Sequence, residues 1–288
     1  MSYEDNPYKK VVDNIVGLPT LPSLVNRIID IMASPNCSSR EISIEIEKNP
    51  VFAARILKMA NSAFYGSPRQ ISSINQAVVL LGFSTLRDAV FAASVVKMFP
   101  EDKSRSVSFA RDDFWIHAFA CGIATRVLAK YLNFPRPAQF FMAGLLHDIG
   151  KLILDQFIHQ DFLKIVNYVE EKDCLFLTAE QELLAANHAL LGGWLAEKWN
   201  LPVELTETIF FHHNPQEAPT HKQVCALVAL ADVLVRALDI GAGGDKRIPH
   251  LTESNFELTG LSQNSLAEII PLVFSEAKES ENLLESFK

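Results

Sequence analysis

The sequence predicts an all-α protein built as a two-lobed helical bundle, and three observations support this fold class. Apolar residues recur at helical spacing along most of the chain, as Leu24, Ile28 and Ile31 do in SLVNRIIDIM. Runs that alternate apolar and polar residues, which are typical of strands, are scarce. A polar segment also interrupts the helical spacing once, so we expect two helical lobes.

Capping patterns mark the ends of individual helices. Ser73 with Gln76, and Thr178 with Gln181, match the capping box, in which a hydroxyl at the helix start binds the backbone three residues on. Gly82 in LLGFS suits a helix end that needs a positive φ angle. We therefore expect helices to begin at these two hydroxyl residues and one helix to end at the glycine.

The interrupting segment is MFPEDKSRSVSFARDD, which replaces the helical spacing with charge, serine and proline. We place a junction within residues 99–110. The first helical lobe then covers residues 18–98, the second covers residues 111–240, and residues 241–288 form a C-terminal helical extension. Ionisable residues on apolar helices gather in the second lobe, so we expect any chemistry there.

Composition excludes several classes of partner. The formal net charge of -8 offers no overall attraction to nucleic acid or to anionic lipid, so neither is a predicted partner. The N-terminus MSYEDNPYKK has no apolar signal core, and no run reaches the roughly 18 uncharged apolar residues that span a bilayer. The four cysteines are far apart without a CxxC pair, which fits a reduced compartment. We therefore predict a cytoplasmic protein.

The stretch AGLLHDIGKLIL places three ionisable residues, His147, Asp148 and Lys151, on one flank of a predicted apolar helix. A buried charge without a partner is costly, so these residues must find counter-charges, hydrogen bonds or a metal. The same anomaly recurs on other predicted helices, and the resulting candidate metal ligands are Asp113, His117, His147, Asp148, His188, His212, His213 and Asp232.

Imidazole nitrogen with carboxylate oxygen is a ligand mixture suited to divalent iron, manganese, zinc or nickel. The candidate set exceeds the needs of one ion, so we expect one or two divalent transition metal ions, with iron as the first choice. Asp148 could bridge two ions about 3.5 to 4 Å apart, the geometry that activates water toward phosphate. Asp148 and Lys151 are therefore the candidate catalytic residues, and Lys151 would face an anion.

Two glycine clusters lie near these candidates. Gly192 and Gly193 follow His188 in AANHALLGGWLAEKW and would permit close approach of another helix. The three glycines of DIGAGGDKR, residues 239–247, match neither GxGxxG nor GxxxxGK[ST], so we interpret this segment as a flexible turn.

The order H…HD…H…HH…D resembles the HD superfamily of metal-dependent phosphohydrolases, and HDIGK resembles its signature. A narrower resemblance is to HDOD domains, the HD-related output domains of bacterial signalling proteins, over residues 18–240. It is carried by LPTLPSLVNRIIDIM, IEKNPVFAARILKMANSAFYG, ISSINQAVVLLGFSTLRDAV, HDIGKLIL, GGWLAEKWNLP and FFHHNP. This resemblance implies an HD-type metal-binding half and a regulatory output without established catalysis.

Similarity to the HD-GYP cyclic-di-GMP phosphodiesterases implies a ligand role for each candidate residue above, with Asp113 standing where an acidic residue is expected. It also implies that Lys151 meets substrate phosphate. The chain departs from that group directly after the paired histidines, where HHNPQEAPTH replaces the HHExxDGxGYP segment. This departure argues against hydrolysis of cyclic-di-GMP.

Three functions are compatible with these patterns. The first is a signalling output module with an HD-type metal site and little or no catalysis, whose partner is a signalling protein or a small phosphorylated ligand. The second is a metal-dependent phosphohydrolase acting on a nucleotide or cyclic dinucleotide. The third is a metal-free hydrogen-bond network, which we rank last because clustered imidazoles have pKa conflicts that a metal removes.

Overall fold

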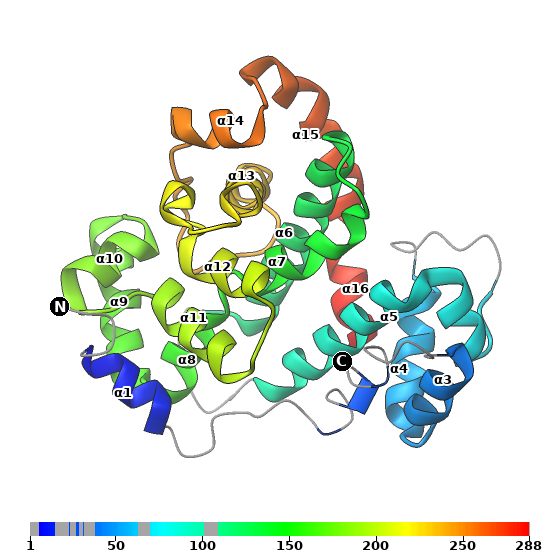
Figure 1. The fold of residues 1–288 in the computed structure, drawn as a ribbon. Helices are drawn as coiled ribbons and strands as arrows, with labels where there is room; N and C mark the ends of the chain where they lie inside the picture. Colours follow the sequence, from blue (N-terminus) through cyan, green and yellow to red (C-terminus); the bar gives the residue numbers. More distant parts are fainter. Residues whose placement is uncertain are drawn as a thin grey trace. The chain divides into compact units, whose positions relative to one another are not determined.

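The structure is a computed structural model, drawn in Figure 1, and it describes residues 6–14, 23, 27, 28, 31, 38–62, 70–100 and 109–287. Helices and turns make up this described part of the chain, and no strand occurs in it. The predicted all-α class is therefore confirmed. Much of the predicted helix at SLVNRIIDIM lies outside the described residues.

The chain divides into two compact units. Unit 1 consists of Met1–Leu18 and Glu101–Lys278, and unit 2 of Pro19–Pro100 and Glu279–Lys288. The division after Pro100 falls inside the predicted junction, most of which lies outside the described residues. The expected C-terminal extension is divided between the units, because residues up to Lys278 belong to unit 1 and Glu279–Lys288 belong to unit 2. The predicted domain ranges stay predictions.

Unit 1 is a helical bundle in which α13 (Lys222–Ala237) packs against α6 (Arg111–Tyr131), α12 (Val203–Phe211) and α14 (Glu253–Thr259), as Figure 1 shows. Its other helices are α1 (Pro7–Asn14), α7 (Phe141–Leu146), α8 (Ile149–Phe157), α9 (His159–Lys172), α10 (Phe176–Leu183), α11 (His188–Lys198) and α15 (Gln263–Ala277), with 3-10 turns η3 (Pro137–Phe140) and η4 (Pro215–Glu217).

Glycines allow α6 and α7 to pack closely. A Cβ atom at Gly122 would lie 2.8 Å from the Phe141 carbonyl oxygen, and one at Gly144 would overlap the carbonyl oxygen of Cys121. Because real Cβ contacts are longer, only glycine fits at either position. This contact places the end of α7, and the residues that follow it, directly beside α6.

Unit 2 contains α3 (Ser39–Glu47), α4 (Pro50–Ala60), α5 (Ile74–Met98) and α16 (Ser280–Phe287). The cap predicted at Ser73 is confirmed, because its hydroxyl accepts a hydrogen bond from the Gln76 backbone N–H at 3.2 Å. Gly82 has φ +80° and interrupts α5 as predicted. The cap predicted at Thr178 is wrong, because α10 begins at Phe176 and Thr178 lies inside its first turn.

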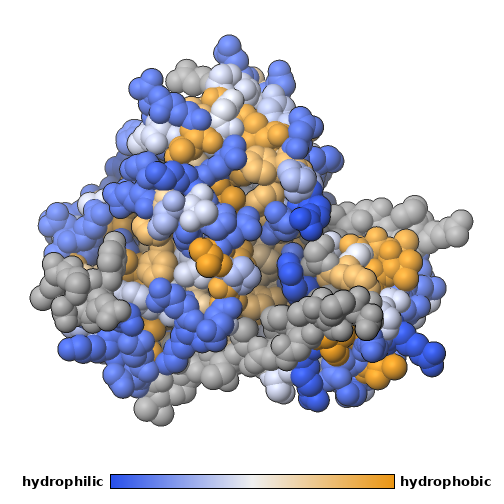
Figure 2. Space-filling view, in the orientation of Figure 1, coloured by the Kyte–Doolittle hydropathy of each residue, from blue (hydrophilic) through white to orange (hydrophobic). Residues whose placement is uncertain are grey.

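The two arms of α5, Ile74–Phe83 and Thr85–Met98, meet at a bend of 107°. No single helix in the described part of the chain has the length and apolar character needed to cross a membrane, and these arms meet that test only when taken together. The first arm exposes Val79, Leu80 and Phe83, which are 68%, 59% and 41% exposed. Figure 2 shows hydrophobic surface over this part of unit 2.

The second arm of α5 buries a carboxylate. Asp88 is 5% exposed, and its Oδ1 accepts hydrogen bonds from Nε and Nη2 of Arg87, both at 3.0 Å. Its Oδ2 has no hydrogen-bond partner among the described residues. Burial raises the pKa of Asp88 to about 6, although the Arg87 guanidinium acts in the opposite direction.

We predict that Asp88→Asn stabilises the protein at pH 7. Between the ordinary pKa of an aspartate, 3.8, and pH 6, the folded protein keeps the Asp88 proton while the unfolded chain loses it. The free energy of unfolding therefore falls as the pH rises through this window. Above about pH 6 the folded protein carries the buried charge. The gain is on the order of 2–3 kcal/mol at pH 7 and disappears near pH 4. Denaturant unfolding at both pH values measures it, with Glu47→Gln on the exposed face of α3 as control. A gain that is equal at both pH values would refute the electrostatic explanation.

Candidate metal centre

His147 and Asp148 lie in the joint between α7 and α8. We expected a continuous helix here, but α7 ends at Leu146 and α8 begins at Ile149, with Asp148 at φ -97° and ψ 10°. The predicted convergence still occurs, because His147 Nε2 and Lys151 Nζ lie 3.4 Å and 2.6 Å from Asp148 Oδ2. The joint therefore presents the Asp148 carboxylate to several helices at once.

A glycine contact brings α11 to this joint. A Cβ atom at Gly150 would overlap the carbonyl oxygen of His188, and one at Gly192 would lie 3.1 Å from the Gly150 nitrogen. The predicted close helix approach at the glycines after His188 is therefore confirmed. As a result, His188, the first residue of α11, reaches the Asp148 carboxylate.

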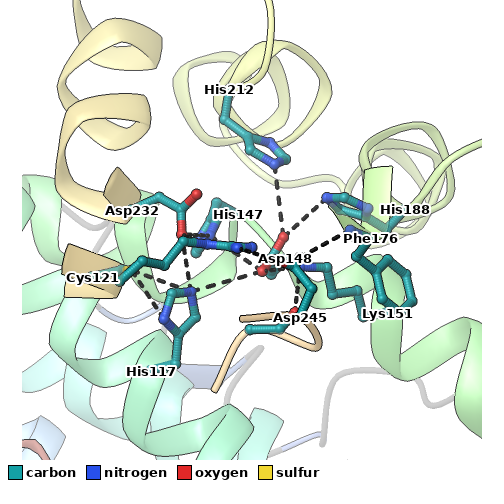
Figure 3. Close-up of polar contacts among 12 residues, drawn as sticks. His117, Cys121, His147, Asp148, Lys151, Phe176, His188, His212, Asp232 and Asp245 are labelled. Atoms are coloured by element: carbon teal, nitrogen blue, oxygen red, sulfur yellow. Dashed lines mark hydrogen bonds and ion pairs between the residues drawn. The ribbon is translucent and has the colours of Figure 1, made fainter. Parts of the chain in front are cut away.

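Two groups of ligand-type side chains surround Asp148, as Figure 3 shows. Group 1 contains His117 and Cys121 from α6, His147 from the joint and Asp232 from α13, and its ligand atoms lie within 4.8 Å of one another. The Nε2 atom of His117 is 3.1 Å from Asp232 Oδ1. Group 1 is completed by Asp148 Oδ2, which is 3.9 Å from His117 Nε2.

Group 2 contains His188, His212 and His213, whose ligand atoms also lie within 4.8 Å of one another. The other oxygen of Asp148, Oδ1, faces this group at 3.0 Å from His188 Nε2 and 3.7 Å from His212 Nε2. The Nε2 atoms of His188 and His213 are 2.8 Å apart, a hydrogen-bonding distance, so one of them carries the proton unless both bind a metal ion. Asp148 therefore joins the two groups through its two oxygens.

Backbone carbonyls fix the tautomers of two histidines. Nδ1 of His147 donates to the Gly144 carbonyl at 2.7 Å, and Nδ1 of His212 donates to the Ile209 carbonyl at 2.9 Å. Each neutral ring then carries a lone pair on Nε2, and neither Nε2 has a hydrogen-bond partner in the part of the chain that is described. Both lone pairs point toward oxygens of the Asp148 carboxylate, which is repulsive unless a cation lies between them.

Burial keeps these imidazoles neutral. It lowers the pKa of His147 and of His213, and it lowers the pKa of His212 to about 3, with neighbouring imidazoles adding to the effect at His212. A metal ligand must be a neutral imidazole, so the three rings have the protonation state that metal binding needs.

The two carboxylates are held ionised. Burial alone would raise the pKa of Asp148, but the Lys151 ammonium and His188 beside it hold that pKa well below its usual range. Burial would also raise the pKa of Asp232, but Arg236 and His117 hold it well below its usual range too. Neutral nitrogen donors therefore alternate with ionised oxygen donors. Ligand atoms around one ion are about 3 to 3.5 Å apart, so these residues fit a divalent transition metal.

Glu180 binds His188 on the side of the ring that faces away from Asp148. Nδ1 of His188 donates to Glu180 Oε2 at 2.6 Å, and the His188 backbone N–H donates to Oε1 at 2.7 Å. Burial lowers the pKa of His188, but Glu180 and Asp148 overcome this effect and raise it. A carboxylate behind a histidine is the usual outer partner of a metal-bound imidazole, where it fixes the ring and strengthens the ligand.

The segment after α13 is packed over this centre, which corrects our interpretation of residues 239–247 as a flexible turn. Lys151 Nζ donates to the Gly243 carbonyl at 2.7 Å, and the Ala242 backbone N–H donates to the Asp113 carbonyl at 2.9 Å. Asp245 accepts hydrogen bonds from Arg236 at 2.8 Å and from the Phe176 backbone N–H at 2.9 Å. The candidate ligands His117, His147, Asp148, His188, His212 and Asp232 are at most 4% exposed.

The structure brings seven of the eight predicted ligands together and leaves one outside. Asp113 is exposed in the first turn of α6, where it lines a surface pocket with Phe109 and Lys246, and it belongs to neither group. The remaining seven, His117, His147, Asp148, His188, His212, His213 and Asp232, occupy the two groups or join them. Their role as ligands stays a prediction.

Four further residues contribute to the centre and were not predicted. Cys121 and Arg236 each lie four residues after a predicted ligand, so helical spacing could have identified both. Glu180 and Asp245 come from other segments, and no local pattern connects them to the histidines. Arg236 Nε donates to Asp232 Oδ1 at 3.0 Å.

Comparisons with known proteins identify the family of the chain. Residues 18–215 match the family described as HDOD domain. An HDOD domain protein of unknown function from Geobacter sulfurreducens is 27% identical with a TM-score of 0.81, over 96% of this chain and 97% of that one. A candidate phosphohydrolase from Shewanella amazonensis SB2B is 27% identical with a TM-score of 0.76, over 97% of this chain and 99% of that one.

A curated relative extends beyond this chain. An uncharacterised protein of Treponema pallidum is 26% identical over 255 residues, which are 88% of this chain and 48% of the relative. The chain therefore spans about half the length of that protein.

We predict that Gly150→Ala destabilises unit 1. The added methyl group would overlap the His188 carbonyl and lie 2.8 Å from the Gly192 nitrogen, so α8 and α11 must separate. Overpacking of this kind costs about 1–3 kcal/mol, which thermal unfolding would measure as a lower Tm. An unchanged Tm would mean that the two helices do not cross at backbone contact.

Proposed function

Because the chain belongs to the HDOD family, we propose that it is a bacterial signal-transduction module whose HD-type half holds divalent transition metal, with little or no catalysis. The resemblance to HDOD domains stated from the sequence is confirmed by the family match. The signalling role and the bound metal are the two parts of the proposal that experiment must test.

One observation carries the metal part of the proposal. The buried Nε2 lone pairs of His147 and His212 have no hydrogen-bond partner among the described residues, and each faces an oxygen of ionised Asp148. Acceptor facing acceptor in a buried site is costly without a cation between them. A divalent ion would supply that cation, and the third hypothesis, a metal-free network, leaves both nitrogens unsatisfied.

When bound, a divalent ion would act as a Lewis acid toward a phosphoryl or water oxygen. The chain's own residues hold and orient the site. Asp148 offers one oxygen to each group, while Glu180 and the Gly144 carbonyl fix the His188 and His147 rings. Lys151 holds Asp148 Oδ2 through a 2.6 Å hydrogen bond.

A second candidate is a metal-dependent phosphohydrolase acting on a nucleotide or cyclic dinucleotide. Its support is the cation at Lys151 beside the centre, together with the similarity to the candidate phosphohydrolase from Shewanella amazonensis. Two features favour the regulatory module instead. Lys151 already donates to Asp148 and to the Gly243 carbonyl, and it is 1% exposed, so no open anion site faces it.

The partner part of the proposal rests on unit 2. The first arm of α5 exposes Val79, Leu80 and Phe83, and α4 exposes Val51 at 63%. Val79, Leu80 and Phe83 share one face of their helix, and exposed apolar side chains grouped in this way are typical of surfaces that bind another protein. We therefore assign recognition of a signalling protein to unit 2, while a small phosphorylated ligand remains the alternative partner.

We expect the purified protein to contain near-stoichiometric iron, manganese or zinc after growth in medium that supplies all three. Asp148→Ala and the more conservative Asp148→Asn should lose this metal, because both groups lose the charged carboxylate that joins them. Elemental analysis measures the content, and Asp113→Ala, which changes an exposed aspartate outside both groups, is the matched control. Wild-type protein without metal, even after reconstitution, would overturn the proposal.

A hydrolysis assay distinguishes the two candidate functions. Metal-loaded protein is incubated with nucleotides and cyclic dinucleotides, with the Asp148→Asn variant in parallel. Released inorganic phosphate is measured for the nucleotides, and linear products are separated by chromatography for the cyclic dinucleotides, because opening a phosphodiester releases no inorganic phosphate. The regulatory proposal expects equal and negligible hydrolysis by both proteins. Metal-dependent hydrolysis by the wild type that is absent from the variant would support the phosphohydrolase.

A further inference from the structure

We infer that unit 1 carries a ligand site separate from the metal centre, which binds a free small organic cation with an apolar body. The site is the surface pocket that Asp113 lines with Phe109 and Lys246, and its volume is about 550 Å³. Pockets of this size hold small molecules. The lining comes from residues around the start of α6, from the end of α9 and from the segment after α13. The inference goes beyond the proposed function and does not depend on a bound metal.

The segment after α13, residues 239–247, separates this pocket from the metal centre. Ala242 and Gly244 line the pocket. Gly243, between them, faces the other way, because its carbonyl accepts a hydrogen bond from Lys151 and a Cβ atom on it would lie 3.3 Å from His117 Nε2. None of the described residues that line the pocket is an imidazole of the centre. A ligand in the pocket would therefore contact the segment and not the candidate metal ligands.

The pocket has an apolar wall that is already in place. Phe109, Val166 and Val169 form this wall. The Phe109 ring packs against Phe162 of α9, with 5.1 Å between the ring centroids, and a Cβ atom at Gly244 would lie 3.6 Å from Phe109 Cε2. Since the three elements contact one another without a ligand, binding requires little ordering of the protein, and the wall can cover the apolar body of a ligand.

Carboxylates outnumber cationic side chains among the described residues that line the pocket. The carboxylates are Asp113, Glu170, Asp173 and Asp245, and the cationic side chain is Lys246. Asp173 and Asp245 are paired with arginines that do not line the pocket. Asp113 and Glu170 are exposed, and neither forms an ion pair with a described residue. Two carboxylates are therefore available to a cationic group of a ligand.

The thiol of Cys174, which also lines the pocket, responds to these charges. Burial raises its pKa, Asp245 and Asp173 raise it further, and Arg247 lowers it by less than either carboxylate raises it. Because carboxylates disfavour the charged thiolate, the potential at this point of the wall is negative in spite of the arginine. The pocket therefore attracts a cation and repels phosphate, so a small phosphorylated ligand does not fit it.

The charge of the ligand is tested by isothermal titration calorimetry of the full-length protein with three indoles of similar shape. Tryptamine carries an ammonium group, tryptophol a hydroxyl group and indole-3-propionate a carboxylate. We expect tryptamine to bind about ten-fold more tightly than tryptophol, and indole-3-propionate to bind most weakly. The advantage of tryptamine should shrink at about 1 M NaCl, which screens exposed carboxylates. Equal affinity for all three indoles, or no binding of tryptamine, would overturn the inference.

A lysine side chain of another protein would present the same ammonium group. Nα-acetyl-lysine amide is the probe for this source, and its thin stem covers less of the apolar wall than an indole does. We therefore expect it to bind more weakly than tryptamine. Equal or tighter binding would assign the pocket to a protein side chain and overturn the inference of a free ligand.

The position of the site is tested by variants of its lining, with thermal unfolding as the folding check. Ala110→Trp fills the pocket from an exposed position just before α6 and should abolish tryptamine binding. Glu170→Gln should weaken it about three-fold. Glu171→Gln is the matched control, since Glu171 is the exposed neighbour outside the described lining, and it should bind as wild type does. Unchanged affinity in both lining variants would place tryptamine elsewhere and overturn the site.

Discussion

The burial of the Asp148 carboxylate is the constraint on which the rest of the centre depends. The residue is 2% exposed, and an isolated charge at such a position costs several kcal/mol after relaxation. Contacts from several helices offset this cost. The joint between α7 and α8 presents the carboxylate, the glycine contact with α11 brings His188 to one oxygen, and Lys151 binds the other. These contacts from α7, α8 and α11 are therefore arranged around one charge.

Much of the fold and of the candidate site could be predicted from the sequence, because helical spacing of apolar residues indicates which face of a helix is buried. A histidine or aspartate on that face is therefore recognisable as an unusual residue from the sequence alone. This argument found His117, His188 and Asp232 correctly as buried residues of one centre. It failed at Asp113 because the first turn of α6 lies at the surface, where four-residue spacing from His117 no longer implies burial.

Other features depend on tertiary contacts that no local pattern contains. Glu180 reaches His188 from the preceding helix, and its importance comes from a 2.6 Å contact rather than from spacing. The packed segment after α13 was misjudged because glycine-rich composition usually signals mobility. Here the glycines allow close approach, since a Cβ atom at Gly241 would overlap the His117 backbone nitrogen. Thr178 matches a capping pattern, but the helix begins two residues earlier.

The packed segment over residues 239–247 has a consequence for exchange with solvent. It contacts Lys151 through Gly243 and is tied to α13 and α10 through Asp245, so an ion held beneath it would leave on this side only when these hydrogen bonds open. Local opening of this kind is slow compared with diffusion. An ion bound in this centre as proposed would then exchange slowly, so its identity would be set mainly by the ions present when the chain folds.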